Sequence, residues 1–586
     1  MLGPRCSRSC LLIGLGLLLL SACAVATPEA AALLPTPSPT VTATPSPAPT
    51  STAPPTPTVT PTPVPTVSLG FLTAPTSTVT ATVTPLLPPP TPDPSDSGLH
   101  FSRAIPAPFG VNIHFTQAEP GELALLEAGG FRFVRMDLFW HKIEHEVKGR
   151  YDFSAYDVLV EDMARHGIRI IFILDYGNDL YGGGNAHHLE EGRAAFARFA
   201  AAAARHYRGR GIIWEIWNEP NLEKFWHAPP DPLNYADLTL KVIAAIRRED
   251  PTAWIVGPAT AGFPWEYLEA LAEVGLFNKL DAVTVHPYRH EAPETVWEDY
   301  VRLRSILDRV SPERKIPIIA GEWGYSTVEG GFTEQQQAEY VVRQWLSHLA
   351  KDVDLSIWYD WRNDGPNPHD LEHNFGLVRL DLEPKPSYTA ARVLNETLKG
   401  YAFQRRIPLA RPDDYVLLFR RGERVALAAW TSGEPHTITL PSFCDEVTVV
   451  EMLGEQQRLP VPGDEMQLDV TSAPRYVHLC RDERVTRLGL WRPVGSIHVV
   501  HSEGTERVLV EVENPYHATL QGTLHVNAGG ETLGEAYVHA APDDVTLVSV
   551  PVHLEDSGVS LLPAVVTFQT PDELPFQSAA IWLHRP

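Results

Sequence analysis

Two glutamates that each follow a short apolar run are the residues of this sequence best placed to do chemistry. Glu219 lies in the run WNEPN, and Glu322 lies in the run GEWGY about a hundred positions later. A pair of carboxyl groups can supply an acid, a base and a nucleophile. At a separation of ~5.5 Å one carboxylate can attack the anomeric carbon of a bound sugar, whereas ~6.5–9.5 Å leaves room for a water and gives inversion. The sequence alone does not give that distance.

Aromatic and polar side chains follow several other predicted strands. Aromatic faces stack on the C–H surfaces of sugars, and polar groups bind the hydroxyls. A set of such residues therefore predicts a carbohydrate site. The candidates for substrate binding are Arg135, Trp140, Asp175, Asn218, His286, Tyr288, Tyr325, Trp358 and Trp361.

These side chains need a scaffold that brings the ends of many strands together. Within residues 101–400, runs rich in Val, Ile and aromatics alternate with segments of helical period. Strands are predicted at 109–115, 131–138, 168–175, 212–217, 254–258, 282–286, 316–321 and 355–359, and helices include 156–166, 191–207, 235–248 and 334–351. This alternation predicts an α/β fold, a (β/α)8 TIM barrel, whose active sites lie at the C-terminal strand ends. An open doubly wound sheet is the competing fold, but the Gly-rich first turn typical of it is missing.

The Asn-Glu-Pro of residues 218–220, together with Glu322 after an apolar strand, resembles clan A of the glycoside hydrolases. Members of this clan are retaining enzymes built on a (β/α)8 barrel. The resemblance implies that Glu219 is the general acid/base and Glu322 the nucleophile. It also implies that Asn218 binds the sugar 2-hydroxyl, and that Arg135 and Tyr288 keep the nucleophile ionised and oriented.

The same resemblance extends to the rest of the pocket. It implies that His286 belongs to the site and that Trp361 or Trp358 forms an aromatic floor, and it implies no metal or organic cofactor. Residues 109–387 most resemble family 39 and its relatives, which include β-xylosidases and endoglycosidases that cut bacterial exopolysaccharide. The shared runs include GRYDFS at 149–154, HPY at 286–288 and FGLV at 375–378. These motifs are specific for the clan and only weakly specific for a family or substrate.

Two motifs have simpler interpretations. Residues 218–220 are also compatible with a helix-start turn, with Glu219 near the helix dipole and Pro220 in the first turn. The run HKIEH at 141–145 matches the H-x-x-E-H zinc-peptidase pattern. That pattern needs a helix facing a cavity, but here it follows a strand directly and precedes a Gly-Arg-Tyr-Asp turn, so a barrel loop is the favoured interpretation.

The first hundred residues predict export and anchoring. Residues 1–22 resemble a lipoprotein signal peptide, with Arg5 and Arg8 before the apolar run 11–20 and a small-residue site that ends at Cys23. In a bacterial lipobox Cys23 becomes the lipidated first residue, and an ordinary cleaved signal is the alternative. Residues 23–100 are mostly Pro, Thr, Ser, Ala and Val without Lys or Arg, which predicts a disordered stalk. A lipid anchor at Cys23 followed by this stalk makes a membrane a predicted partner.

The C-terminal part of the chain lacks helical periodicity. Short predicted strands separated by turns indicate two β-sandwiches, at residues 401–484 and, Ig-like, at 485–586. Cys444 and Cys480 lie in this half of the chain. In an oxidising compartment they could pair, and two buried free thiols are the alternative.

Charge and composition restrict the possible functions. The chain has 47 Lys and Arg against 72 Asp and Glu, a formal net charge of −25. Phosphate backbones would repel so acidic a protein, which argues against a nucleic-acid partner. We therefore predict an exported retaining β-glycoside hydrolase whose partner is a cell-surface or extracellular carbohydrate. A non-catalytic sugar-binding surface lipoprotein and a transglycosylase with the same residues are the alternatives.

Overall fold

The computed structural model describes residues 101–480, except 408, 410, 443 and 464, and then residues 494–584. Gaps in the second range fall at 503–504, 515–518, 529–530, 542–543, 553–560 and 570–575. The predicted signal peptide, Cys23 and the predicted stalk lie outside the described residues.

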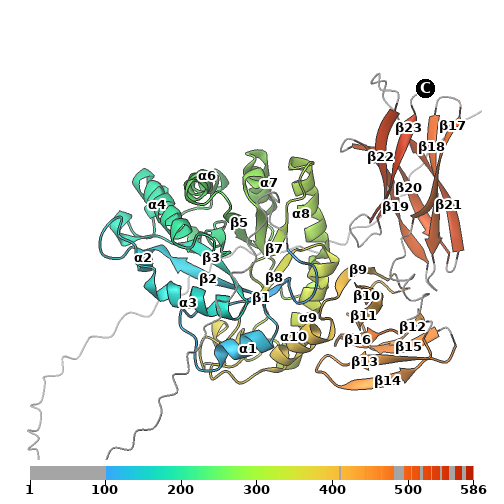
Figure 1. Ribbon diagram of the computed structural model, residues 1–586, viewed down its shortest axis with the longest axis horizontal. Coiled ribbons are helices and arrows are strands. Elements are labelled where there is room, and N and C mark those ends of the chain that lie inside the picture. Colours follow the sequence, from blue (N-terminus) through green and yellow to red (C-terminus); the bar gives the residue numbers. More distant parts are fainter. Residues whose placement is uncertain are drawn as a thin grey trace, which may run out of the picture. The chain divides into compact units, whose positions relative to one another are not determined.

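The first part of the described chain is a closed barrel of eight parallel strands (Figure 1). Neighbouring strands follow chain order, and β1 closes the barrel by pairing with both β2 and β8. The strands are β1 (Phe109–Asn112), β2 (Phe133–Phe139), β3 (Arg169–Asp175), β4 (Ile213–Ile216), β5 (Trp254–Ala261), β6 (Ala282–His286), β7 (Ile318–Ala320) and β8 (Leu355–Trp358). All eight predicted strands and the barrel fold are confirmed.

Helices surround the barrel, as Figure 1 shows. Two of them begin with strong caps: Asp231 accepts backbone hydrogen bonds before the proline that opens α6, and Thr333 and Gln336 form a capping box at α9. The α-helices are α1 (Glu122–Ala128), α2 (Trp140–Ile143), α3 (Ser154–Arg165), α4 (Glu190–His206), α5 (Glu223–Trp226), α6 (Pro232–Glu249), α7 (Trp265–Glu273), α8 (Trp297–Val310), α9 (Glu334–Ala350) and α10 (Pro386–Thr397). The short 3₁₀ turns are η1 (Asp179–Tyr181), η2 (Ala186–His188), η3 (Leu276–Lys279), η4 (Pro293–Val296) and η5 (Glu372–Asn374).

Apolar side chains fill the barrel interior below its mouth. This interior cluster consists of Phe133, Ile171, Ile213, Val256, Ala282, Ile319, Leu355 and Ile357. Because side chains alternate along a strand, the next inward positions on β2 and β4 are Arg135 and Glu215. The apolar cluster thus supports a layer of charged side chains that lies nearer the C-terminal strand ends.

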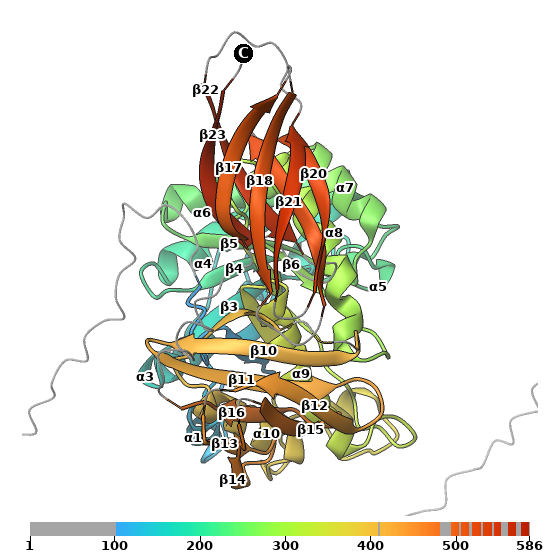
Figure 2. The ribbon, with the colours of Figure 1, turned by 90° about the vertical axis from the view of Figure 1, so that its right-hand side faces the viewer.

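A first group of antiparallel strands follows the barrel. One sheet has the order β14-β13-β16-β11-β10-β9 and a second pairs β12 with β15; β10 and β11 run side by side in Figure 2. The strands are β9 (Ala402–Arg406), β10 (Asp414–Arg421), β11 (Arg424–Thr431), β12 (His436–Pro441), β13 (Glu446–Val450), β14 (Gln456–Pro460), β15 (Glu465–Val470) and β16 (Arg475–His478). Tyr415, Trp430 and Tyr476 are buried in the same apolar cluster as the outer barrel residues, so these strands share a core with the barrel.

A second group of antiparallel strands has a core of its own. Its sheets have the orders β17-β18-β21 and β20-β19-β22-β23. The strands are β17 (Val494–Ser502), β18 (Thr505–Asn514), β19 (Leu520–Ala528), β20 (Glu531–Ala540), β21 (Asp544–Val552), β22 (Leu561–Gln569) and β23 (Phe576–His584). The predicted all-β character of the C-terminal region is confirmed. The predicted boundary at residue 484 lies outside the described residues and stays a prediction.

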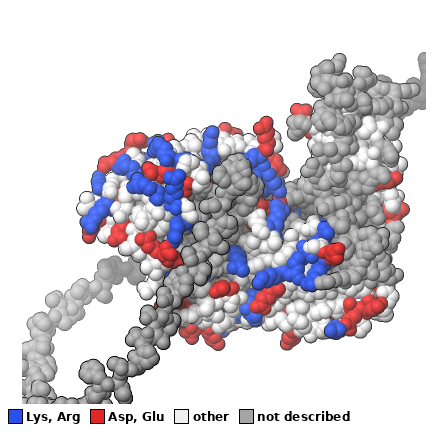
Figure 3. Space-filling model, in the orientation of Figure 1, with Lys and Arg blue, Asp and Glu red and all other residues white. Residues whose placement is uncertain are grey.

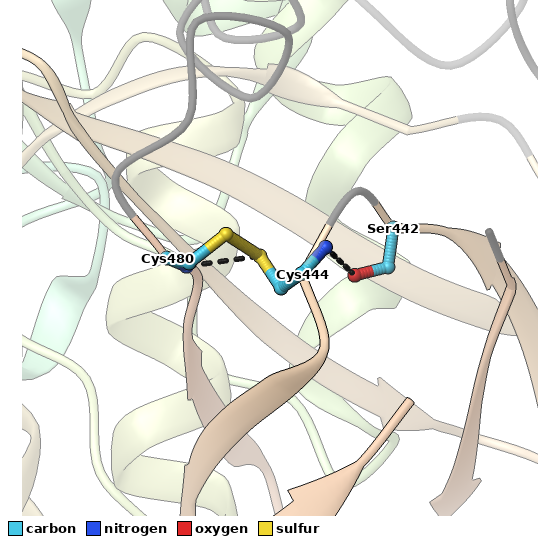
Figure 4. The surroundings of a disulfide bond; sticks show 3 residues. All are labelled: Ser442, Cys444 and Cys480. Atoms are coloured by element: carbon cyan, nitrogen blue, oxygen red, sulfur yellow. Dashed lines mark hydrogen bonds between the residues drawn. A yellow bond between two sulfur atoms is a disulfide. The ribbon is translucent and has the colours of Figure 1, made fainter. Parts of the chain in front are cut away.

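Cys444 and Cys480 form a disulfide (Figure 4). The pairing links the segment before β13 to the residue that follows β16 by two positions, across 36 residues of sequence. A cross-link that closes such a loop restricts the unfolded chain.

We expect Cys444→Ser/Cys480→Ser to lose about 2–4 kcal/mol of unfolding free energy in urea. Reductant should destabilise the wild type and leave the variant unchanged; equal unfolding midpoints for oxidised and reduced wild type would contradict this.

Among the described residues, no helix combines the length and the apolar character that crossing a membrane requires. On the face that Figure 3 shows, basic and acidic side chains are interspersed over the barrel rather than separated by sign.

Candidate active site

Glu219 lies in a turn of unusual backbone geometry that follows β4. Trp217 and Glu219 both have positive φ, at 67° and 47°. Residues other than glycine adopt this region rarely, and they remain there only where the surroundings fix them. Here the Glu219 amide donates to the carbonyl of Ala259 in β5, at 2.9 Å. The strain therefore serves to aim a carboxyl group into the barrel mouth, and Glu219 is not in an ordinary helix-start turn.

Glu219 and Glu322 both lie close to the same ring nitrogen of His286, which ends β6. The imidazole Nδ1 lies 2.9 Å from Oε1 of Glu219 and 3.8 Å from Oε2 of Glu322. A carboxylate oxygen of each glutamate and a nitrogen of His286 all lie within 4.8 Å of one another. This upper limit lies below the ~6.5–9.5 Å of carboxyl pairs that admit a water, so it fits the arrangement in which one group attacks the sugar directly.

Two donors hold the Glu322 carboxylate. Arg135 Nη1 donates to its Oε2 at 2.8 Å, and the Tyr288 hydroxyl donates to its Oε1 at 3.0 Å. The two donors fix the rotation of the carboxyl group. Glu322 is thus held in one orientation.

Arg135 is the centre of a buried polar network. Its guanidinium also donates to Glu215 (Nε to Oε2, 2.5 Å), Asn218 (Nη2 to Oδ1, 2.8 Å) and Asn112 (Nη1 to Oδ1, 3.1 Å). Burial alone would lower the pKa of Arg135, but Glu215 and Glu322 outweigh it and the pKa is raised. Arg135 stays charged, and its hydrogen bonds connect strands β1, β2 and β4 to Glu322, which lies just after β7.

Glu219 and His286 have environments that differ from that of Glu322. Burial raises the pKa of Glu219 to about 7, against the opposing effect of Arg135 and Lys224. Burial lowers the pKa of His286 to about 4, so the imidazole is neutral near pH 7. Glu219 can therefore carry a proton near pH 7, as a general acid requires.

The other aromatic candidates lie in the core. Trp140, Trp358, Trp361 and Tyr325 are each at most 1% exposed. They hydrogen-bond to the protein itself, Trp140 to Glu144 at 2.6 Å, Trp361 to Glu122 at 2.9 Å, Trp358 to the Phe375 carbonyl at 3.4 Å and Tyr325 to the Glu291 carbonyl at 2.8 Å. The structure places them beneath the mouth rather than on its surface. Their contact with substrate stays a prediction.

Asp175 ends β3 and is fully buried. Burial, reinforced by the neighbouring Asp137, raises the pKa of its carboxyl group well above the usual range. Its contact with substrate stays a prediction.

Sequence analysis missed several residues of the mouth. Tyr359 is partly exposed, and its ring lies 5.3 Å from Phe375, 5.5 Å from His114 and 6.4 Å from Tyr288. The sequence signal that could have indicated Tyr359 is its position as the last residue of the predicted strand 355–359. Glu215 could have been found as a carboxylate inside an otherwise apolar strand, which requires a buried cation nearby.

The described residues contain two sets of His and carboxylate groups close enough to share a cation. One set is Glu219, His286 and Glu322, and the other is His114, Asp360 and Asp364. Neither comes from the H-x-x-E-H run. Its Glu144 is buried and accepts hydrogen bonds from Trp140, Tyr181 and the Gly149 amide, so that run anchors a barrel loop.

Comparison with known families agrees with this geometry. Residues 107–365 match the family model described as Cellulase (glycosyl hydrolase family 5). The barrel is a clan A glycoside hydrolase domain. The predicted resemblance to the clan is thereby confirmed.

Two curated relatives are similar to part of this chain. A β-xylosidase of Geobacillus stearothermophilus is 28% identical over 211 residues, which is 32% of this chain and 41% of the relative. A β-xylosidase of Caldicellulosiruptor saccharolyticus is 24% identical over 210 residues, with the same coverage. The chain thus matches about two fifths of the length of these curated relatives.

A solved structure shares the fold. The family 39 glycoside hydrolase from the gut symbiont Bacteroides cellulosilyticus WH2 has a TM-score of 0.58 and 24% sequence identity. The similarity covers 64% of this chain and 81% of that one.

Proposed function

We propose that this chain is a retaining β-glycoside hydrolase with Glu322 as the nucleophile and Glu219 as the general acid/base. The observation that carries the proposal is the pair of carboxyl groups within 4.8 Å that lie in different electrostatic environments. Glu322 accepts from Arg135 and Tyr288, while burial raises the pKa of Glu219 to about 7. The clan A domain supports the same assignment.

The reaction proceeds in two displacements. Glu322 attacks the anomeric carbon while the protonated Glu219 gives its proton to the departing glycosidic oxygen, so that a glycosyl ester forms. Glu219, now ionised, then removes a proton from water as the water attacks the same carbon and releases Glu322. Two inversions give net retention. In this proposal Asn218, whose Oδ1 accepts from Arg135, binds the sugar 2-hydroxyl.

The substrate that we propose is a β-linked poly- or oligosaccharide at or outside the cell surface. The curated relatives that match the barrel are β-xylosidases, which makes β-xylosides the first substrates to test. The experiment is a panel of aryl β-glycosides with NMR detection of the first-formed anomer. Turnover with a β-configured product supports the proposal. An α-configured product, or sugar binding without turnover, would overturn it, and transfer to a sugar hydroxyl would indicate a transglycosylase.

The pH dependence follows from Glu219. A general acid must be protonated, and the protonated fraction of Glu219 falls as pH rises through its pKa of about 7. We expect kcat/KM for a glycoside with a poor leaving group to fall tenfold per pH unit above about pH 7. Glu219→Gln should abolish this basic limb. An unchanged limb in that variant would assign it to another group.

We propose further that the protein is exported and held at a membrane by lipid on Cys23. The support is the Leu-Ser-Ala-Cys site at 20–23 after a basic and then an apolar segment. In a bacterial host, the full chain should enter the detergent phase after detergent–water partition, and Cys23→Ala should move it to the aqueous phase. Equal partition of both forms would exclude the anchor.

A further inference from the structure

Glu294 is a buried carboxylate at which three parts of the molecule meet. It lies in η4, between β6 and α8, and is 6% exposed. Arg343 of α9 donates to both of its oxygens, each at 2.7 Å. Trp430 of β11 donates its indole N–H to Oε1, also at 2.7 Å. A barrel loop, a barrel helix and a strand of the first β-sandwich are thus joined by one charged group.

Aromatic side chains surround Glu294 and its partner Trp430 and shield them from water. Trp430 stacks on Tyr415 with ring centroids 5.0 Å apart, and Tyr415 meets the edge of Trp297, the first residue of α8, at 5.2 Å. The Arg406 guanidinium lies 4.5 Å from the Tyr415 ring and 5.1 Å from the Trp297 ring. Burial opposes the charge of Arg343, but pairing with Glu294 raises its pKa above the usual value. Buried, paired and hydrogen-bonded charges of this kind fix one geometry.

The loop that Glu294 anchors also carries Tyr288, one of the two donors to Glu322. Between these two residues, the Glu291 carbonyl accepts from the Tyr325 hydroxyl at 2.8 Å. Tyr325 lies three residues after Glu322, so the segment carrying Glu322 is tied to the same loop. Arg289 of the loop pairs with Asp299 of α8 at 2.9 Å. Residues 287–296 therefore form a short strap between the mouth and the sandwich.

We infer that Trp430 is a positioning residue for the active site. Through Glu294 and the strap of residues 287–296, it holds the Tyr288 hydroxyl against Glu322. The first group of antiparallel strands, β9 to β16, then contributes to catalysis by the hydrolase and is not an appended module. This inference rests on the proposed function, in which the ionised Glu322 attacks the sugar.

The test compares pH profiles of kcat/KM for the full chain. Tyr288→Phe removes one of the two donors to ionised Glu322, so the acid limb should move up by about one pH unit. Trp430→Phe keeps an aromatic ring near Tyr415 but deletes the donor to Glu294. We expect the acid limb to move the same way by about half a unit, because the Tyr288 bond loosens, with a roughly tenfold lower kcat. The double variant should have the acid limb of Tyr288→Phe alone.

Tyr476→Phe is the matched control. Tyr476 is buried in the same core on β16, the strand paired with β11, and its hydroxyl has no hydrogen-bond partner among the described residues. It should keep the wild-type acid limb. If Trp430→Phe fails to fold, as judged by near-UV circular dichroism, Glu294→Gln tests the same link, since it removes the charge that anchors the strap.

The outcomes separate this inference from the function on which it rests. A wild-type acid limb in folded Trp430→Phe, or an unshifted limb in Tyr288→Phe, would overturn the positioning role while turnover by the wild type upholds the hydrolase. Absence of turnover by the wild type across the glycoside panel would overturn the proposed function and, with it, this inference.

Discussion

Glu322→Ala is expected to lower kcat on the order of 10⁵-fold, with the protein still folded. The variant lacks the group that attacks the anomeric carbon, and alanine leaves a small space beside Arg135 and Tyr288, which held the carboxylate. Added azide should enter this space, attack the same carbon and restore turnover. Because only one displacement then occurs, the glycosyl azide should have the inverted, α configuration.

The matched control for this experiment is Glu329→Ala. Glu329 follows the same strand but is exposed, so its replacement should leave kcat unchanged. Wild-type kcat in Glu322→Ala would contradict the assignment. So would an azide product of retained configuration, since it would show that a second nucleophile acts before azide.

Arg135→Met should damage both stability and catalysis. The substitution leaves Glu215 buried without its cation, which costs about 3–5 kcal/mol of unfolding free energy. It also removes a donor from Glu322 and releases Asn218, so kcat/KM should fall about 10³-fold even in the folded fraction. Urea unfolding and steady-state kinetics on the same preparation measure the two effects.

Arg135→Lys distinguishes charge from geometry at this position. Lysine keeps the positive charge but cannot reach Glu215, Glu322 and Asn218 together, because it lacks the planar fork of donors. We expect it to recover part of the stability and little of the activity. Arg150→Met, at an exposed arginine, should change neither. Full activity in Arg135→Lys would show that the network does not position Glu322.

The barrel could be predicted from sequence because its signals are local. Each strand is a short apolar run, and the longer helices between them have a clear 3.6-residue period. The C-terminal ends of parallel strands meet at one rim, so Glu219 and Glu322 could be placed together before their separation was known. The close approach of their oxygens, within 4.8 Å, depends on the positive-φ turn at residues 217–219, which no local pattern indicates.

Tertiary contacts decide the parts that sequence could not predict. Trp358 ends β8, and Tyr359 and Trp361 follow it, but whether each faces the core or the mouth depends on the loops packed over them. The Cys444–Cys480 bond required knowledge of sheet order. The hydrogen bonds of Glu294 to Arg343 and Trp430 join the barrel to β11 across residues 294 to 430, far beyond any sequence window.

The central claim is that Glu322 forms the covalent intermediate, and trapping that intermediate tests it most directly. A 2-deoxy-2-fluoro β-glycoside with a good leaving group reacts with the nucleophile and then hydrolyses slowly, since the fluorine destabilises the positively charged transition states. Mass spectrometry of the digested protein should find one added sugar, on the peptide and then on the residue Glu322. A sugar attached to another residue, or turnover of the same glycoside with inversion and no adduct, would contradict the account.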